Sequence, residues 1–103
     1  MNHQFDDIVR WAKDRNILEG STPQAQMLKL TEEVGELARG VAQGNWDEVY
    51  DAIGDCVVVL TIVAKMHHAS MDFCLNKAWL TIRDRRGTMR DGVFVKEESV
   101  DMD

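Results

Sequence analysis

Two short acidic stretches hold the side chains best suited to chemistry in this 103-residue sequence. Their members are Glu32, Glu33, Glu36, Glu48, Asp51 and Asp55. At about 100° per residue, Glu33 and Glu36 lie within roughly 60° of each other on a helix, and Glu33 borders the apolar stripe. Acid rows on two facing helices make a site for a hard divalent cation, and oxygen-only ligands favour Mg²⁺ or Mn²⁺.

A solvated acidic face is the alternative interpretation, because acidic residues on helices usually face water. Two observations favour the metal site. Asp is a poor helix former, yet Asp51 and Asp55 fall within a helical pattern, and acids one turn apart repel each other without a counterion. Asp55 also stands at the start of the apolar run 56–64, where a carboxylate without a partner is unfavourable. We therefore expect a cation beside Asp55.

Four amphipathic helices are predicted to position these acids. Apolar residues recur at helical spacing over about 3–15, 23–43, 46–68 and 71–86, and residues 16–21 are predicted to form a loop. Thr22 before Pro23, and Asn45 with Glu48 as a capping box, are helix start signals, while Gly44 ends the second helix. The predicted fold class is all-α in a single domain, 1–103.

The C-terminal part carries a turn signal after the fourth helix. Asp91 and Gly92 stand between two extended runs, which predicts a short β-hairpin. The tail 97–103 is predicted to be disordered. The inward positions of the fourth helix are predicted to be Phe73, Ala78 and Ile82.

Composition and charge narrow the class of protein. The hydrophobic fraction is 45% and the charged fraction 29%, as in ordinary globular domains. The net charge of −6 argues against nucleic acid or an anionic membrane as a partner. Cys56 and Cys74 form no CxxC motif and are expected to be buried, reduced thiols. Without a signal peptide or an apolar run long enough to span a bilayer, the expected location is the cytoplasm.

The run 56–64 is apolar all round the helix except at Thr61. A four-helix chain of this size can hardly cover such a segment alone. We therefore predict an obligate oligomer that buries parts of 23–43 and 46–68 between chains.

Two segments resemble the motifs of the MazG-like nucleotide pyrophosphohydrolases, EExxE followed after a spacer by ExxD. The first is Lys29–Leu37, KLTEEVGEL, and the second is Ile53-Gly54-Asp55 before the apolar run. The segments 82–87 and 91–96 are similar to short phage-type members. The resemblance implies a four-helix fold with a C-terminal hairpin, homodimers or homotetramers, and Mg²⁺-dependent cleavage of a (d)NTP to (d)NMP and pyrophosphate.

The resemblance also implies roles for particular residues. Glu33, Glu36 and Asp55 match the metal ligands. Ala52 stands where the family pattern has Glu, and the adjacent Asp51 is the candidate replacement, which leaves the number of ions open. In the expected reaction a water activated by Mg²⁺ attacks the α-phosphorus, and Glu32 orients or deprotonates that water. The candidate substrate contacts are Lys29, Asn76, Lys77 and Arg83.

Two other functions are consistent with the sequence. One is a non-catalytic helical dimerisation module whose acidic faces serve solubility. The other is a metal-dependent phosphohydrolase acting on ppGpp-like or diphosphate substrates, which lacks support because no His is directly followed by Asp. No motif specifies the preferred base, the sugar or the physiological role.

Overall fold

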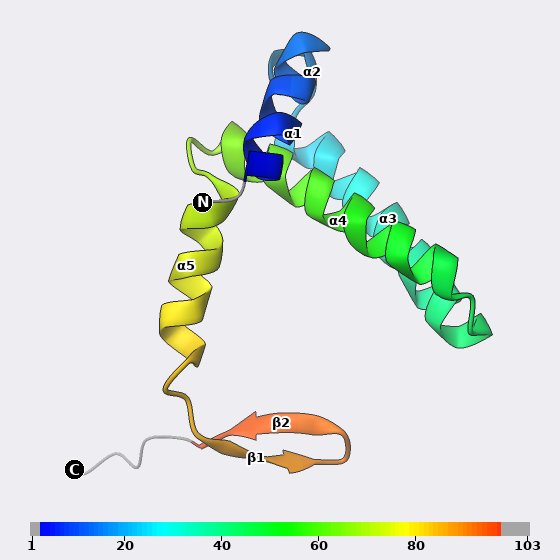
Figure 1. Ribbon diagram of the computed structural model, residues 1–103, viewed down its shortest axis with the longest axis vertical. Helices are drawn as coiled ribbons and strands as arrows, with labels where there is room; N and C mark the ends of the chain where they lie inside the picture. The colour runs from blue at the N-terminus through cyan, green and yellow to red at the C-terminus, as the bar shows by residue number, and fades with distance from the viewer. Residues whose placement is uncertain (1–2, 98–103) are drawn as a thin grey trace.

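The computed structural model describes residues 3–97. Its helices are α1 (His3–Asp14), α2 (Ile17–Gly20), α3 (Pro23–Gln43), α4 (Trp46–Met66) and α5 (Met71–Ile82), followed by the strands β1 (Gly87–Arg90) and β2 (Val93–Lys96). Figure 1 shows α3 and α4 packed side by side, α1 and α2 at one end of that pair, and α5 with the hairpin extending away from it. The predicted helical class with a C-terminal hairpin is confirmed.

Apart from a one-residue difference at the end of α1, the helix boundaries differ from the sequence prediction in three places. The predicted loop 16–21 contains the one-turn helix α2, because Gly20 and Ser21 donate to the carbonyls of Asn16 and Ile17 at 2.8 and 2.9 Å. α4 ends at Met66 because His68 adopts a left-handed φ of 62°. α5 ends at Ile82, four residues before the predicted end, where Arg85 closes a tighter turn on Ile82 at 2.9 Å.

Side-chain caps fix the starts of α3, α4 and α5. Thr22, Asn45 and Ser70 accept backbone hydrogen bonds at 3.1, 3.2 and 3.0 Å from the residues three positions later. Only one of the two hydrogen bonds of the predicted capping box forms, the one from the Glu48 N–H to Asn45. The Asn45 N–H donates to the Gly40 carbonyl at 2.9 Å, and the Glu48 carboxylate instead accepts from Arg39 at 2.9 Å.

The core lies between α3, α4 and α1. Its buried apolar side chains are Ala12, Val49, Ala52, Val59, Ile62, Ala64 and Met71. Thr61, the polar residue in the apolar run, donates to the Val57 carbonyl at 2.6 Å and so enters the core without an unpaired hydroxyl. Gly40 lies so close to α4 that an added Cβ would lie 3.2 Å from the backbone nitrogen of Val49.

The predicted hairpin is confirmed at the residues that signalled it. β1 and β2 are antiparallel, with Arg90 opposite Val93 and Gly87 opposite Lys96. Asp91 and Gly92 both have positive φ, 49° and 81°, as a type I′ turn requires. The predicted disorder of 97–103 concerns residues 98–103, which lie outside the described part, and Glu97, which donates to the Arg86 carbonyl at 2.7 Å.

Most of α5 is exposed to solvent, and Met71 is its one buried residue. The prediction that Phe73, Ala78 and Ile82 point inward is wrong for a single chain, because all are exposed. Cys74 is exposed as well and Cys56 is only half-buried, so the expectation of two buried thiols is wrong; both cysteines are free, as predicted. The reason is visible in Figure 1: α5 meets α4 near its first turn and then leaves it.

The chain is correspondingly extended. Its radius of gyration is 17.0 Å, against about 13 Å for a compact domain of this length. Across residues 3–97, every helix is too short or too polar to span a membrane.

Candidate metal centre

The acidic centre sits at mid-length in the interface between α3 and α4. On α3, Glu33 and Gly40 are buried at a spacing of seven residues, which places them on the face that meets α4. On α4, Ala52 and Val59 are buried on the opposing face, and Asp55 lies between them in the helical repeat. Because Gly40 has no side chain, α3 approaches α4 closely at this position, on the face that also carries Glu33.

Glu33, Glu36 and Asp55 converge in this interface. One carboxylate oxygen from each lies within 4.8 Å of the others. Glu33 is buried, with 5% of its surface exposed, whereas Glu36 and Asp55 are open to solvent. Oε1 of Glu33 lies 3.2 Å from Nζ of Lys29, one turn earlier on α3. Oε2 of Glu33 is buried and has no hydrogen-bond partner in residues 3–97.

The pKa values in the cluster are shifted because three carboxyl groups lie close together. The adjacent Glu33 carboxylate raises the pKa of Glu36. Although Asp55 is exposed, its contact with the α3–α4 interface partly desolvates the carboxylate, and this, followed by the charges of Glu33 and Asp51, raises its pKa. Burial also acts to raise the pKa of Glu33, but hydrogen bonding, first of all from the Lys29 ammonium, outweighs it and lowers the value. The nearest cation therefore compensates one carboxylate of the three.

These features fit a divalent cation. The cluster offers oxygen donors only, which suits Mg²⁺ and Mn²⁺. A buried carboxylate oxygen without a partner is unfavourable, and a cation in the cluster would satisfy Oε2 of Glu33. Residues that could hold the ion are Glu33, Glu36 and Asp55.

Other acidic residues singled out in the sequence lie at the margin. Asp51 is exposed and does not belong to the group of three, although its charge acts on Asp55. Glu32 is exposed on α3, and Glu48 is engaged by Arg39. Ala52 is 2% exposed in the helix interface, so its small side chain fills the space in which the family motif has Glu.

The candidate substrate contacts are divided between two places. Lys29 reaches the centre through its ion pair with Glu33, a pairing that its i, i+4 spacing could have indicated from the sequence. Asn76, Lys77 and Arg83 are exposed on α5 or directly after it. Figure 1 shows that part of the chain leading away from the α3–α4 pair, so one chain does not bring these three to its own acidic centre.

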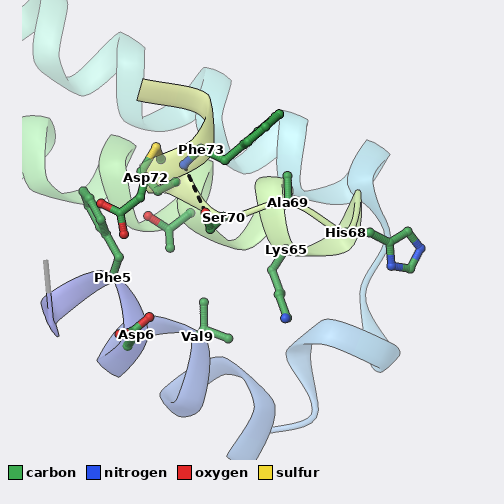
Figure 2. Close-up of a pocket in the computed structure, with 11 residues that line it drawn as sticks. Phe5, Asp6, Val9, Lys65, His68, Ala69, Ser70, Asp72 and Phe73 are labelled. Atoms are coloured by element: carbon green, nitrogen blue, oxygen red, sulfur yellow. Dashed lines mark hydrogen bonds between the residues drawn. The ribbon is translucent and has the colours of Figure 1, made fainter. Parts of the chain in front are cut away.

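A separate hollow of about 590 Å³ marks the junction between α5 and the rest of the chain. Figure 2 shows Phe5 and Val9 of α1 on one side of it, and Ser70, Asp72 and Phe73 on the other. Its remaining lining residues are Asp6, Thr61, Lys65, His68, Ala69 and Met71. None of the predicted site residues lines this hollow, which is distinct from the acidic centre.

Comparison with known proteins gives one family and one relative. Residues 21–88 match the model of the MazG nucleotide pyrophosphohydrolase domain. A protein of Haemophilus phage HP1, described as an uncharacterized 18.2 kDa protein in the rep-hol intergenic region, is 55% identical over 62 residues. That match covers 60% of this chain and 38% of the phage protein, so the chain spans well under half of its relative. No solved structure matches.

Proposed function

Because the chain belongs to the MazG nucleotide pyrophosphohydrolase family, we propose that it is an Mg²⁺-dependent enzyme that hydrolyses a nucleoside triphosphate to the monophosphate and pyrophosphate. The observation that supports this most strongly is Oε2 of Glu33, a buried carboxylate oxygen without a partner, beside two further carboxylates. A solvated acidic face would leave every oxygen in contact with water.

In the proposed reaction Glu33, Glu36 and Asp55 hold the ion, and Asp51 assists from the rim. A bound Mg²⁺ would supply positive charge near the phosphate oxygens and would lower the pKa of a nearby water. Lys29 fixes one oxygen of Glu33, so that the other faces the centre. Glu32, one residue along and exposed, accepts a proton as water attacks the α-phosphorus. The bond between the α-phosphorus and its bridging oxygen breaks, and pyrophosphate leaves.

Asn76, Lys77 and Arg83 are the proposed contacts to the substrate's phosphates or base. Their exposure leaves them available to a ligand. Since they lie away from the acidic centre of their own chain, such contacts call for an assembly of more than one chain.

A homodimer or homotetramer is the proposed assembly. Apolar residues at seven-residue spacing remain exposed on both long helices: Met27, Val34 and Val41 on α3, and Trp46, Ile53 and Leu60 on α4. Exposed apolar rows of this kind mark a surface that packs against another protein. The open shape of the chain supports the same proposal.

The decisive experiment is hydrolysis of a panel of NTPs and dNTPs with MgCl₂ in ¹⁸O-labelled water. Attack at the α-phosphorus places the label in the monophosphate and releases unlabelled pyrophosphate. Glu33→Gln should abolish release, while Glu19→Gln, an exposed acid on α2, should preserve it. If no nucleotide yields pyrophosphate although the protein is folded and oligomeric, the chain is a non-catalytic helical module instead.

A further inference from the structure

Basic and acidic side chains are separated along this chain. Residues 3–82 carry twelve acidic and seven basic side chains, whereas residues 83–97 carry three acidic and five basic ones. The basic residues of that segment are Arg83, Arg85, Arg86, Arg90 and Lys96. A protein of net charge −6 therefore ends its described part in a positively charged hairpin region.

A hollow of about 680 Å³ lies beside the hairpin. It is lined by Arg85, Arg86, Gly87, Thr88, Arg90, Phe94, Val95, Lys96 and Glu97. Arg83 pairs with its neighbour Asp84 at 3.4 Å, but Arg85, Arg86 and Arg90 make no ion pair with any residue of the described part. Guanidinium groups without acidic partners are well suited to phosphate oxygens, which they bind through two parallel hydrogen bonds.

The acidic centre lacks such groups in its own chain. Lys29 is engaged by Glu33 and Arg39 by Glu48. A triphosphate held there would carry several negative charges beside three carboxylates. Figure 1 shows the hairpin at the far end of α5, away from the α3–α4 pair, so a chain's own arginines do not approach its own centre.

The segment that carries the hairpin exposes apolar side chains on opposite sides of its helix. We use "arm" for residues 71–97. Leu75, Trp79 and Ile82 share one side of α5, and Phe73 and Leu80 share the opposite side; all five are exposed. A helix that is apolar on opposite sides is normally enclosed by other elements.

A second copy of this chain has a surface that is complementary to the arm. It offers exposed apolar rows on α3 and α4 to the apolar sides of α5, and acidic character to the basic hairpin. The lengths are compatible: α5, which ends just before Arg85 and Arg86, is about 18 Å long, while Asp55 lies about 16 Å from the Met66 end of α4.

We propose that the arm of one chain docks on a second copy and places Arg85, Arg86 and Arg90 against the phosphates of a nucleotide bound at the partner's acidic centre. Each active site is then shared between two chains. This inference rests on the proposed function, because it concerns the same substrate and the same site.

Mixing two defective chains tests the inference directly. The arm variant carries Arg85→Gln with Arg86→Gln, and the centre variant carries Asp55→Asn. Each alone should be nearly inactive. In an equal mixture, refolded together, half of the dimers pair the two variants, and each of these contains one intact shared site. Such a two-fold dimer should restore about a quarter of wild-type pyrophosphate release.

Several controls separate the possible failures. Wild-type protein that releases no pyrophosphate contradicts the proposed function. Active wild-type protein with no recovery in the mixture contradicts the shared site alone, as does full activity of the arm variant by itself. Arg10→Gln with Lys13→Gln removes equal charge from α1 and should leave activity unchanged. If the arm variant fails to fold or to dimerise, Arg85→Lys with Arg86→Lys replaces it; this pair keeps the charge, and partial activity is expected.

Binding provides a readout that does not depend on turnover. The arm variant should bind an α,β-methylene dNTP at least about tenfold more weakly in calorimetry, since bonds to charged groups are lost. Its shift in melting temperature with MgCl₂ alone should equal that of the wild type. Equal affinity of the two proteins for the analogue overturns the proposal.

Photo-cross-linking locates the arm. A photoreactive phenylalanine derivative at Thr88, in a mixture of ¹⁵N-labelled and unlabelled chains, should couple to segments 26–36 or 51–60 of the other chain. Coupling within one chain, or only to α1 of the other, contradicts the proposed position.

Discussion

The α3–α4 pair and the arm are formed by equally clear local signals, yet the pair buries several apolar side chains and the arm buries only Met71. Both contain helices that start at a side-chain cap, and the arm has in addition a hairpin closed by a type I′ turn. In the pair, Gly40, Ala52 and Val59 are buried against the neighbouring helix. In the arm, Trp79 keeps 56% of its surface exposed.

The difference shows that local signals and tertiary burial are separate requirements. Caps and turns satisfy backbone groups within a few residues and form wherever their sequence occurs. Burial of an apolar side requires a surface of matching shape, which the pair finds in itself. The arm finds none in its own chain, and its apolar sides therefore indicate where another chain belongs.

The largest expected effect comes from removing an acid at the centre of the pair. Asp55→Asn should lower pyrophosphate release by at least about 100-fold, because a ligand oxygen of the ion is lost. Stability without metal should be unchanged or higher at pH 7. A carboxyl whose folded pKa is raised, as that of Asp55 is, stabilises the fold at low pH and loses that contribution as pH rises through the folded pKa.

Circular dichroism and thermal melts with EDTA check the stability, and pyrophosphate release checks the activity. An unfolded Asp55→Asn protein would show that this carboxylate supports the α3–α4 interface rather than the reaction.

Removing an apolar anchor from the arm should have the next largest effect. If Trp79 is enclosed between chains, Trp79→Ala destabilises the oligomer by about 3–5 kcal/mol. If it stays as exposed as in one chain, the change is within about 0.5 kcal/mol. We expect the first result, measured as a raised dimer dissociation constant in light scattering. Trp11→Ala is the control, because Trp11 is similarly exposed at 44% but stacks under Arg15 of its own chain.

Alanine substitutions at two glycines of α3 test how closely α3 and α4 pack. In Gly40→Ala the new methyl would lie 3.1 Å from Cγ2 and 3.2 Å from the backbone nitrogen of Val49. Since backbone cannot move aside cheaply, unfolding free energy should fall by about 1–3 kcal/mol. In Gly35→Ala nothing lies within 4 Å of the new methyl, so stability should rise by about 0.5–1 kcal/mol. Urea denaturation compares the two, and equal effects would contradict the close approach at Gly40.

The sequence predicted the elements better than their surroundings. Thr22, Pro23, Asn45 and Gly44 marked α3 and α4 because caps act on neighbouring backbone. Asn16 did not mark α2, since a one-turn helix has no apolar periodicity to detect. The burial of Phe73 and Ile82 was mispredicted because amphipathic spacing shows which side of a helix needs cover, not whether the same chain supplies it.

The candidate site was predictable to a similar degree. Helical spacing brought Glu33 and Glu36 together, and the second motif supplied Asp55, as the structure shows. The buried oxygen of Glu33 was not predictable, because it depends on the depth to which α3 packs on α4. The basic hollow of the hairpin was also not predicted, because a cluster of arginines in the sequence does not show that the surface around it is concave. The unusual density of arginine between 83 and 90 was the available signal.

The smallest expected effect shows whether Asp51, at the edge of the α3–α4 interface, is a metal ligand or only a charged neighbour of the site. Asp51 lies one turn from Asp55, is exposed, and acts on the pKa of Asp55 by its charge. The family motif has Glu where this chain has Ala52, and Asp51 could contribute a weak fourth oxygen in its place. In that case Asp51→Ala should raise the Mg²⁺ concentration for half-maximal activity by about three- to tenfold, the effect expected from loss of a supporting residue of a metal site. Asp47→Ala, which removes an equal charge from the first turn of α4, should leave that concentration unchanged. Titration of activity with MgCl₂ measures both. An unchanged magnesium dependence in Asp51→Ala would assign the ion to Glu33, Glu36 and Asp55 alone, so that α3 supplies two ligands and α4 one.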